Sequence, residues 1–235
     1  MTNGTPVDVL STVSNGGGSD SAEAMASGGA LVGFESSTIP QYGFNWQFVD
    51  YPFTRNDASF DDHLDVVSDV EPGYAVAPDV EDDIPLSDAV NWGDQLLDHA
   101  DVVIIVPKEN AHPGDVPDRF RVGYTAQPKW GSNAPWGLRD YRDAGDIHLL
   151  GGSPSKHSRL ARYDVLVRSV DTASPLKAAQ FGDVWTVRGW TERPKLTYYE
   201  RIESSYSNII DAWNDDRDPA AIRSDQQHGI DDFGP

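Results

Sequence analysis

Val102-Val103-Ile104-Ile105-Val106 is an unbroken run of β-branched apolar side chains. Because neighbouring side chains of a strand point to opposite faces, a strand of this composition is apolar on both faces. Both faces must then be covered, as in a parallel sheet between layers of helices, whereas a half-exposed antiparallel strand alternates with polar residues. The run therefore predicts a parallel strand over residues 102–107 in an α/β protein.

Seven further apolar runs flank this strand, each closed by a polar, Gly or Pro cluster. They cover residues 7–13, 30–35, 46–51, 74–78, 120–124, 147–150 and 165–170. Helices fit the intervening segments 61–70, 86–99, 136–144 and 155–163. Eight strands that alternate with helices favour a closed (β/α)8, TIM-like barrel over an open doubly wound sheet, formed as a single domain by residues 1–213.

The two ends of the chain are less regular. After the first strand, Asn15-Gly16-Gly17-Gly18-Ser19 fits a flexible loop and a ligand-gripping loop equally well. From about residue 176, the aromatic residues predict a helical extension that packs on the barrel. We expect the acidic tail, residues 214–235, to be disordered.

The composition is strongly acidic. The 235 residues include 38 Asp and Glu against 18 Lys and Arg, a net charge of −20. Such a surface stays hydrated in molar salt, so we expect a protein of a halophilic archaeon or of its virus, with an ordinary acidic protein as the alternative. The absence of Cys excludes disulfides and thiolate metal sites, and no cofactor is predicted. No segment suits a signal peptide or a membrane span, so we expect a cytoplasmic protein.

The positive charges gather in one half of the chain. Residues 1–118 hold 22 acidic residues and two basic ones, Arg55 and Lys108, whereas residues 119–235 hold 16 of each. The basic residues of the second half include Arg119, Arg121, Lys129, Arg139, Arg142, Lys156, Arg159, Arg162 and Arg168. They fit a surface that meets an anion and, equally, salt bridges to neighbouring Asp.

Polar residues follow the predicted strands at equivalent positions. In a TIM barrel, the loops after the strands build the active site. In chain order, those positions hold Glu35, Asp50, Asp79, Lys108, Gly123 with Tyr124, Gly151-Gly152-Ser153, and Asp171. A single carboxylate of this kind fits a solvated loop, but several at equivalent strand ends indicate a functional site.

The segment His148-Leu149-Leu150-Gly151-Gly152-Ser153-Pro154 joins the seventh predicted strand to a helix. Glycine lets the backbone approach a ligand closely, and a helix N-terminus offers unpaired N–H groups. The usual phosphate site of a TIM barrel is built from the loops after strands seven and eight. The segment therefore predicts phosphate binding, with a tight turn before a capped helix as the alternative.

The order of these motifs over residues 30–175 resembles that of the tRNA-guanine transglycosylases, and most closely their compact phage and archaeal-virus relatives that insert 7-deazaguanines into DNA. Val49-Asp50-Tyr51-Pro52-Phe53 is similar to the strand end that supplies an active-site aspartate in that family. Pro78-Asp79-Val80-Glu81 is similar to the strand end that recognises the base. Arg168-Ser169-Val170-Asp171-Thr172 is similar to the strand end that carries the nucleophile.

Two further segments extend the resemblance. Arg121-Val122-Gly123-Tyr124 falls where the family has a glycine-rich strand end under the base, and residues 148–154 resemble its Leu-Met-Gly-Val-Gly-Thr-Pro segment. The chain departs from the tRNA enzymes because it has no Cys for their zinc site, Tyr51-Pro52 replaces their Ser-Gly-Gly, and it is too short for an added RNA-binding domain. These departures favour DNA over tRNA as the partner.

The resemblance implies a base exchange in which Asp171 is the nucleophile and Asp50 transfers a proton or contacts the base. Substrate binding would fall to Asp79, Lys108, Gly123, Tyr124, His148, Gly151, Gly152 and Ser153. The partners would be a nucleic acid and a free 7-deazaguanine, with Tyr124, Trp130 and Trp136 as candidates for stacking on bases.

Two other functions stay open. Lys108 ends a strongly apolar strand, where burial favours an amine that acts on a sugar phosphate as a Schiff-base or acid-base group. The chain could also be a non-catalytic accessory or nucleic-acid-binding protein that keeps a barrel scaffold, because a fold does not guarantee activity.

Overall fold

The computed structural model describes residues 6–13, 18–53, 55, 57–81, 83–108, 110–125, 136–160 and 165–214. Lys129, Trp130, Arg162, residues 15–17 of the glycine segment and the tail from residue 215 lie outside the described residues. What the sequence predicts for them therefore stays a prediction.

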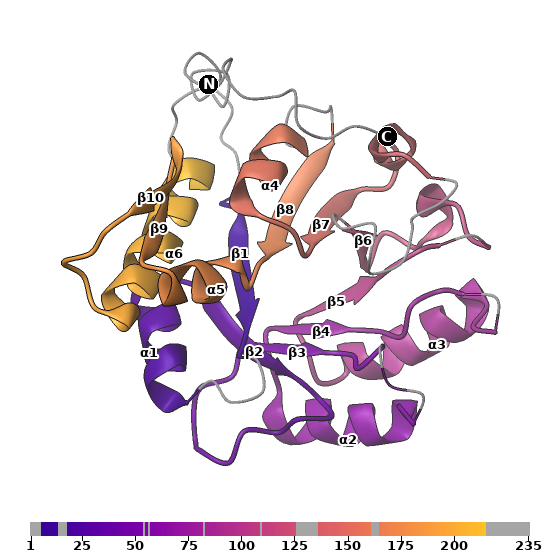
Figure 1. Cartoon of the computed structure of the whole chain (residues 1–235). Helices are drawn as coiled ribbons and strands as arrows, with labels where there is room; N and C mark the ends of the chain where they lie inside the picture. The colour runs from indigo at the N-terminus through magenta and orange to yellow at the C-terminus, as the bar shows by residue number, and fades with distance from the viewer. Residues whose placement is uncertain are drawn as a thin grey trace.

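Eight parallel strands close into a barrel in chain order, with β8 paired to β1 (Figure 1). The strands are β1 (Asp8–Thr12), β2 (Leu31–Glu35), β3 (Phe48–Asp50), β4 (Tyr74–Val76), β5 (Val102–Ile105), β6 (Arg121–Thr125), β7 (Asp146–Leu150) and β8 (Leu166–Asp171). Each falls within or overlaps a predicted apolar run. The prediction of a (β/α)8, TIM-like barrel is confirmed.

Helices cover the outside of this barrel. They are α1 (Ser19–Ser27), α2 (Phe60–Val70), α3 (Leu86–Leu97), α4 (Pro154–Leu160), α5 (Ser174–Gln180) and α6 (Tyr198–Asn214), with short 3-10 helices η1 (Pro113–Asp115) and η2 (Leu138–Tyr141). The predicted helix over 136–144 is only the 3-10 turn η2, which ends before Gly145, a residue with a φ of +67°. The sequence analysis predicted no helix for residues 20–27, where α1 lies.

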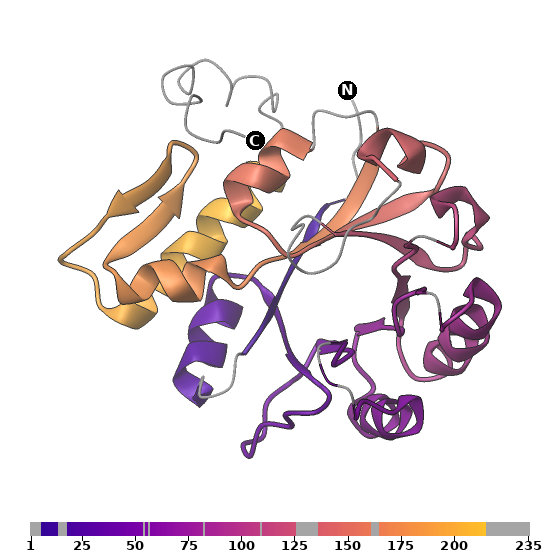
Figure 2. The same cartoon turned by 45° about the vertical axis from the view of Figure 1, so that its right-hand side comes forward.

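The chain continues past the barrel into a lateral extension, which stands at one side of the barrel in both Figure 1 and Figure 2. The sequence predicts helices here, and the structure adds a hairpin of β9 (Asp183–Thr186) and β10 (Gly189–Glu192) that the sequence analysis missed. The helix α6 packs against α1 and β9. Its buried Tyr206 hydroxyl lies 2.6 Å from Ser11 Oγ and donates to the Thr172 carbonyl, which ties the extension to β1 and to the end of β8.

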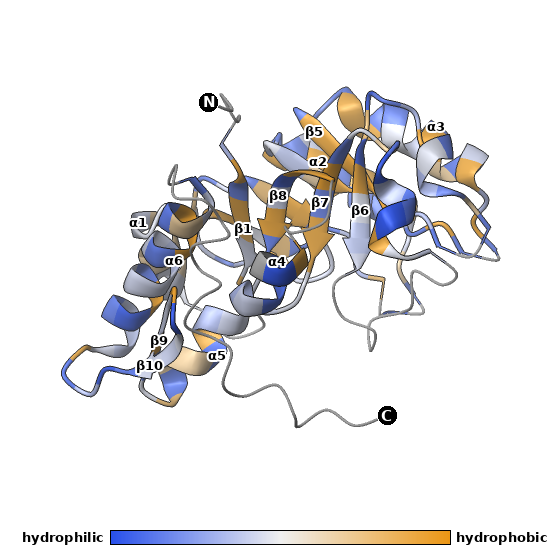
Figure 3. Cartoon of the chain, turned by 90° about the horizontal axis from the view of Figure 1, so that it is seen from above, coloured by the Kyte–Doolittle hydropathy of each residue, from blue (hydrophilic) through white to orange (hydrophobic). Residues whose placement is uncertain are grey.

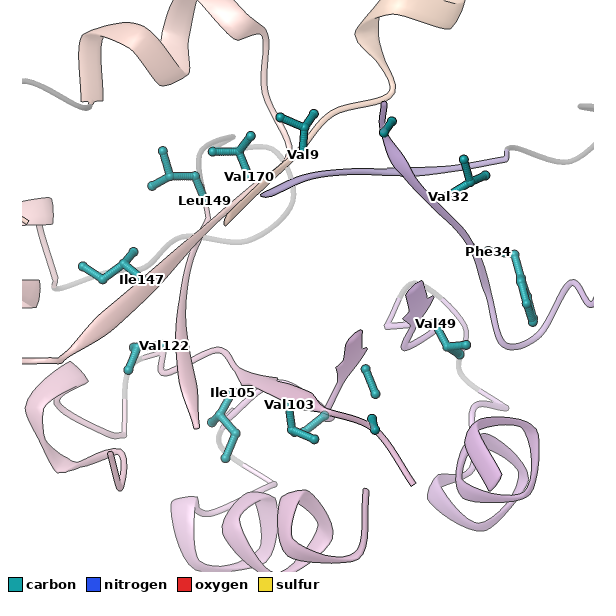
Figure 4. Packing of buried hydrophobic residues seen from close by; sticks show 14 of the residues in the cluster. Val9, Val32, Phe34, Val49, Val103, Ile105, Val122, Ile147, Leu149 and Val170 are labelled. Atoms are coloured by element: carbon teal, nitrogen blue, oxygen red, sulfur yellow. The ribbon is translucent and has the colours of Figure 1, made fainter. Parts of the chain in front are cut away.

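The alternating side chains of the strands build two apolar layers. Val103, Ile105 and their equivalents on the other strands point outward to the helices, as Figure 4 shows. Ile104 and Val106 point inward and pack with Phe48 and other residues in the barrel interior. The two-faced apolar run is therefore explained, and Figure 3 shows apolar strands inside with polar residues on the outer helices. No helix in the described part of the chain is long and apolar enough to cross a membrane.

Candidate active site

A cavity of about 440 Å³ opens at the carboxyl ends of the barrel strands. Its polar lining comes from Thr12, Glu35, Asp50, Tyr51, Asp79, Thr125, Gly151, Gly152, Ser153, Asp171, Ser174 and Lys177. The structure thus brings together six of the ten residues to which the resemblance assigns a role: Asp50, Asp79, Gly151, Gly152, Ser153 and Asp171. They come from four strand ends spread over more than 120 residues of the chain.

The strand ladder places three of the carboxylates. Glu35, Asp50 and Asp171 are the last residues of β2, β3 and β8, and the β2–β3 register sets Glu35 directly beside Asp50. Asp79 follows β4 and is held by the parallel bridge between Val80 and Pro107. Because parallel strands end on the same edge, all four side chains reach one cavity.

A bulge in β8 sets the direction of Asp171. On β7, Ile147 and His148 are consecutive, but their partners on β8 are Val167 and Ser169, so Arg168 is an extra residue. Val167 and Val170 both pack in the outer layer, which regular alternation would not allow. A bulge re-aims the side chains that follow it. Ser169 and Asp171 therefore point into the barrel.

The carboxylate of Asp171 is held on one oxygen. Its Oδ1 accepts hydrogen bonds from the Gly151 N–H at 2.7 Å and from His148 Nε2 at 3.2 Å. Gly151 and Gly152 have φ values of +60° and +102°, which favour glycine and turn the Gly151 N–H toward Asp171. Donors of this kind stabilise an ionised carboxylate.

Two hydrogen bonds from neighbouring side chains hold the turn that carries Gly151. His157 of α4 donates from Nε2 to the Gly151 carbonyl at 2.5 Å, and Thr172 Oγ1 donates to the Gly152 carbonyl at 2.7 Å. Burial lowers the pKa of His157, so its imidazole remains neutral. The glycine loop is thus held so that its Gly151 N–H group meets Asp171.

Asp50 lies in an environment that disfavours its negative charge. Burial raises its pKa well above the usual value, and the negative charges of Asp171, Glu35 and Asp79 raise it further. A hydrogen bond from the Tyr51 N–H opposes this shift in part. Two carboxyl groups therefore face one cavity, with the pKa of Asp50 raised and Asp171 held by hydrogen-bond donors.

Asp79 is paired with a buried cation. Burial raises the pKa of Asp79, and the Lys108 ammonium 2.6 Å from its Oδ2 partly offsets that rise. Lys108 Nζ also lies 2.7 Å from Glu81 Oε1, and the side chain of Lys108 is only 7% exposed. Burial alone would lower the pKa of Lys108, but the two carboxylates raise it overall. The lysine is a protonated partner of Asp79.

Four of the predicted substrate-binding residues do not line this cavity. Lys108 and His148 lie one layer deeper, behind Asp79 and Asp171. Gly123 faces the interior, where a Cβ atom would come within 2.6 Å of Leu150 Cδ1, so it is required for packing. Tyr124 alternates with Gly123 and packs outward, edge-on to a buried tyrosine of η2.

The second half of the rim offers hydrogen-bond donors and a cation. Ser153, Ser174 and Lys177 line it beside the two glycines, and Lys177 is the one basic side chain that the described residues contribute to the lining. Ser174 and Lys177 were not predicted from the sequence, because they lie in α5, beyond the residues that directly follow β8. Arg119 and Arg168 instead form salt bridges with Asp94 and Asp146, at 2.6 and 3.1 Å.

No group of three or more His, Asp or Glu in the described part of the chain is placed to hold a metal ion. Trp136 donates from Nε1 to the Lys108 carbonyl and lies edge-on to His112, so it supports the loop after β5.

The closed parallel barrel and the polar cavity at its strand ends place the chain in the class of (β/α)8-barrel proteins, with the cavity where barrel enzymes have their active sites. The chain belongs to the family of unknown function DUF6610, which matches residues 25–214.

A solved structure of similar fold is the YdjI aldolase from Escherichia coli K12, with a TM-score of 0.51 and 10% sequence identity. The match covers 87% of this chain and 88% of the aldolase. At this identity the likeness concerns the fold alone. No curated protein matches the sequence.

Proposed function

We propose that the chain is a glycosyltransferase that exchanges a guanine of a nucleic acid for a 7-deazaguanine through a covalent bond to Asp171. The observation that supports this proposal is a pair of carboxyl groups at one cavity, in which burial raises the pKa of Asp50 while two N–H donors hold Asp171. A retaining glycosyl transfer needs one carboxyl group as acid and another as nucleophile.

The exchange would consist of two displacements at C1′ of the sugar. The free oxygen of Asp171 forms a bond to C1′ of the sugar while the bond between C1′ and the base nitrogen breaks, and its electron pair leaves with the base. Asp50 gives its proton to the departing base. The incoming base returns a proton to Asp50 as its nitrogen attacks C1′ and releases Asp171. Both carboxyl groups end as they began.

The rest of the cavity fits the two ends of a nucleotide. Asp79 accepts hydrogen bonds and therefore suits purine N–H groups, as its place in the motif order implies. Ser153, Ser174 and Lys177 suit the sugar or phosphate on the opposite rim. The acidic chain meets a polyanion only where salt is high, since a Debye length of about 3 Å at 1 M screens its net charge.

Lysine chemistry at Lys108, on a sugar phosphate, is the alternative that the sequence left open. A Schiff-base lysine needs a free amine that reaches the substrate. Lys108 is instead a protonated ammonium in contact with two carboxylates and does not line the cavity. Borohydride reduction with carbonyl substrates separates the two functions, because an adduct trapped on Lys108 would support lysine chemistry and exclude the exchange.

The exchange itself is tested with labelled guanine, single- and double-stranded DNA, and tRNA in molar salt. We expect label to enter one nucleic acid and a covalent adduct to survive denaturing electrophoresis. Asp171→Asn should remove both signals. The control Asp146→Asn changes a part-exposed carboxylate at the start of β7 and should keep them. Nucleoside mass spectrometry of DNA and tRNA from cells with and without the gene then identifies the substrate.

A further inference from the structure

A chain of hydrogen bonds crosses the barrel interior from the start of β1 to the end of β8. The Tyr74 hydroxyl donates to Asp8, and Arg121 Nη1 lies 2.8 Å from the Tyr74 hydroxyl and 3.0 Å from Ser169 Oγ. The chain goes on from Ser169 Oγ to His148 Nδ1 at 2.7 Å and from His148 Nε2 to Asp171 Oδ1 at 3.2 Å. Its residues come from five strands.

The strand ladder aligns this chain. Asp8 pairs with Ser169 between β1 and β8, and His148 pairs with Ser169 between β7 and β8. Ser169 and His148 have no solvent exposure. The arrangement depends on the bulge at Arg168, which turns Ser169 and Asp171 inward together.

The direction of each hydrogen bond follows from Arg121, because a guanidinium has donors and no acceptor. Its Nη1 carries two hydrogens, and the two contacts use both. On one side, the Tyr74 hydroxyl accepts from Arg121 and passes its own hydrogen to Asp8. Burial and Asp8 raise the pKa of Tyr74 to about 12, so the phenol keeps its proton.

On the other side, Ser169 accepts from Arg121 and has one hydrogen left to donate. The acceptor in reach is His148 Nδ1, so the histidine carries its hydrogen on Nε2. The other end of the ring requires the same tautomer, because an unprotonated Nε2 would set its lone pair against the Asp171 carboxylate. Both ends of the imidazole therefore agree.

We infer that Arg121 and Ser169 are positioning residues that hold His148 as the Nε2–H tautomer, which fixes Oδ1 of Asp171 and presents its other oxygen to the cavity. The role of that second oxygen rests on the proposed function, whereas the assignment of the tautomer is independent of it. Arg121 cannot pass on a proton, because it is not deprotonated in proteins. The chain therefore orients Asp171 and does not conduct protons.

Nitrogen NMR of the folded chain tests the tautomer without any substrate. Long-range correlation spectra of ¹⁵N-histidine protein show which ring nitrogen carries hydrogen, and His148→Gln assigns the signals among the six histidines. We expect Nδ1 of His148 to be an unprotonated acceptor and Nε2 to be protonated. Hydrogen on Nδ1 in the wild-type chain would overturn the inference.

Two variants test the positioning residues. In Ser169→Ala, the Nδ1 signal should move toward that of a nitrogen without a hydrogen bond. In Arg121→Met, the Ser169 hydroxyl loses the donor that directs its hydrogen to Nδ1, so this hydrogen bond should weaken and the Nδ1 signal should move in the same direction by a smaller amount, while Nε2 stays protonated against Asp171. Unchanged spectra in both folded variants would exclude the roles of Arg121 and Ser169.

Ser11→Ala is the matched control. Ser11 is as buried as Ser169 and also lies in a barrel strand, but its hydroxyl contacts Tyr206. It should leave the His148 signals unchanged, and it reports the stability cost of removing a buried hydroxyl.

Kinetics separates this inference from the proposed function. Ser169→Ala should lower kcat about 10- to 100-fold, the range seen when an outer hydrogen-bond partner is lost, with KM nearly unchanged. A wild-type chain without exchange activity would reject the proposed function and leave the NMR result standing. Exchange activity with the opposite tautomer would reject the inference alone.

Discussion

Nζ of Lys108 lies 2.6 Å from Oδ2 of Asp79, so the cation that neutralises this carboxylate comes from the protein interior and not from the substrate. Removal of the Lys108 ammonium should leave the Asp79 carboxylate buried without a partner, which lowers the free energy of unfolding by about 3 kcal/mol or more. We predict that Lys108→Met loses this amount in urea unfolding at molar salt. Lys177→Met, at an exposed position, should unfold like wild type.

The same pair gives an internal check. Asp79→Asn combined with Lys108→Met removes both charges, so the double variant should be more stable than the sum of the single losses. Additive losses would mean that the two side chains do not depend on each other in the folded chain.

Substitution of Asp171 and substitution of Asp79 should impair the exchange in different ways. Asp171→Asn should lose exchange and adduct alike, because an amide cannot take up the glycosyl group. Asp79→Asn leaves the attacking group in place and adds a donor to an acceptor-only side chain, so selectivity between bases should suffer more than adduct formation. Competition between labelled bases measures the difference. Both variants must melt like wild type in molar salt, and near-normal exchange by Asp171→Asn would remove it from the mechanism.

Asp50 links activity to pH. Between the usual pKa of an aspartate and the raised pKa of Asp50, the folded chain holds a proton that the unfolded chain has lost, so stability falls as pH rises through this window. Asp50→Asn cannot titrate, and it should melt higher than wild type at alkaline pH. Its exchange rate should fall roughly 10²- to 10⁴-fold through loss of the acid. Melting curves and rates over a pH series test both, and equal alkaline melting temperatures would contradict the buried-acid account.

A side chain at Gly123 should crowd the barrel interior. A Cβ atom there would lie 2.6 Å from Leu150 Cδ1 and 2.8 Å from Val106 Cγ2, and overpacking of this kind costs about 1 to 3 kcal/mol. Gly123→Ala should therefore lower the free energy of unfolding by that amount. Gly43→Ala, where a Cβ atom meets nothing within 4 Å, is the control and should cost little.

The excess of acidic residues predicts a dependence on salt. With a net charge of −20, repulsion between carboxylates is unscreened in dilute buffer and should destabilise the folded chain. Melting followed by circular dichroism should shift upward between dilute buffer and molar KCl. An unchanged melting temperature would argue for an ordinary acidic protein.

The barrel strands could be predicted because their side chains are apolar on both faces. Ile104 and Val106 fill the interior while Val103 and Ile105 meet the helices, and both demands are visible in the sequence. The helix α1 was missed because it buries Ser21, Ala22, Ala24 and Met25, mostly small side chains that make no apolar stripe. The hairpin β9–β10 was missed because its strands are short and mixed in character.

The carboxylates of the site could be predicted from one positional rule, because parallel strands end on one edge of the sheet. The buried residues that hold these carboxylates could not be predicted in this way. Ser169 and His148 are 21 residues apart, and their pairing depends on a bulge that no local pattern announces. Regular alternation from Asp171 backward would place Val167 inside the barrel, where the structure has it outside. His157 likewise acts on a backbone carbonyl, a contact without a sequence signal.

The bulge at Arg168 also means that β8 has one residue more than its ladder uses. A chain that lacked this residue would keep Val167 in the outer layer and would still turn Ser169 and Asp171 inward, losing only the salt bridge to Asp146. Relatives should therefore tolerate a one-residue gap at this point while the chemistry stays intact. A one-residue deletion between Ser169 and Asp171 would instead turn the Asp171 side chain out of the barrel and abolish the activity of the site. Loss of one residue from β8 is thus harmless to the site before Ser169 and destroys the site after Ser169.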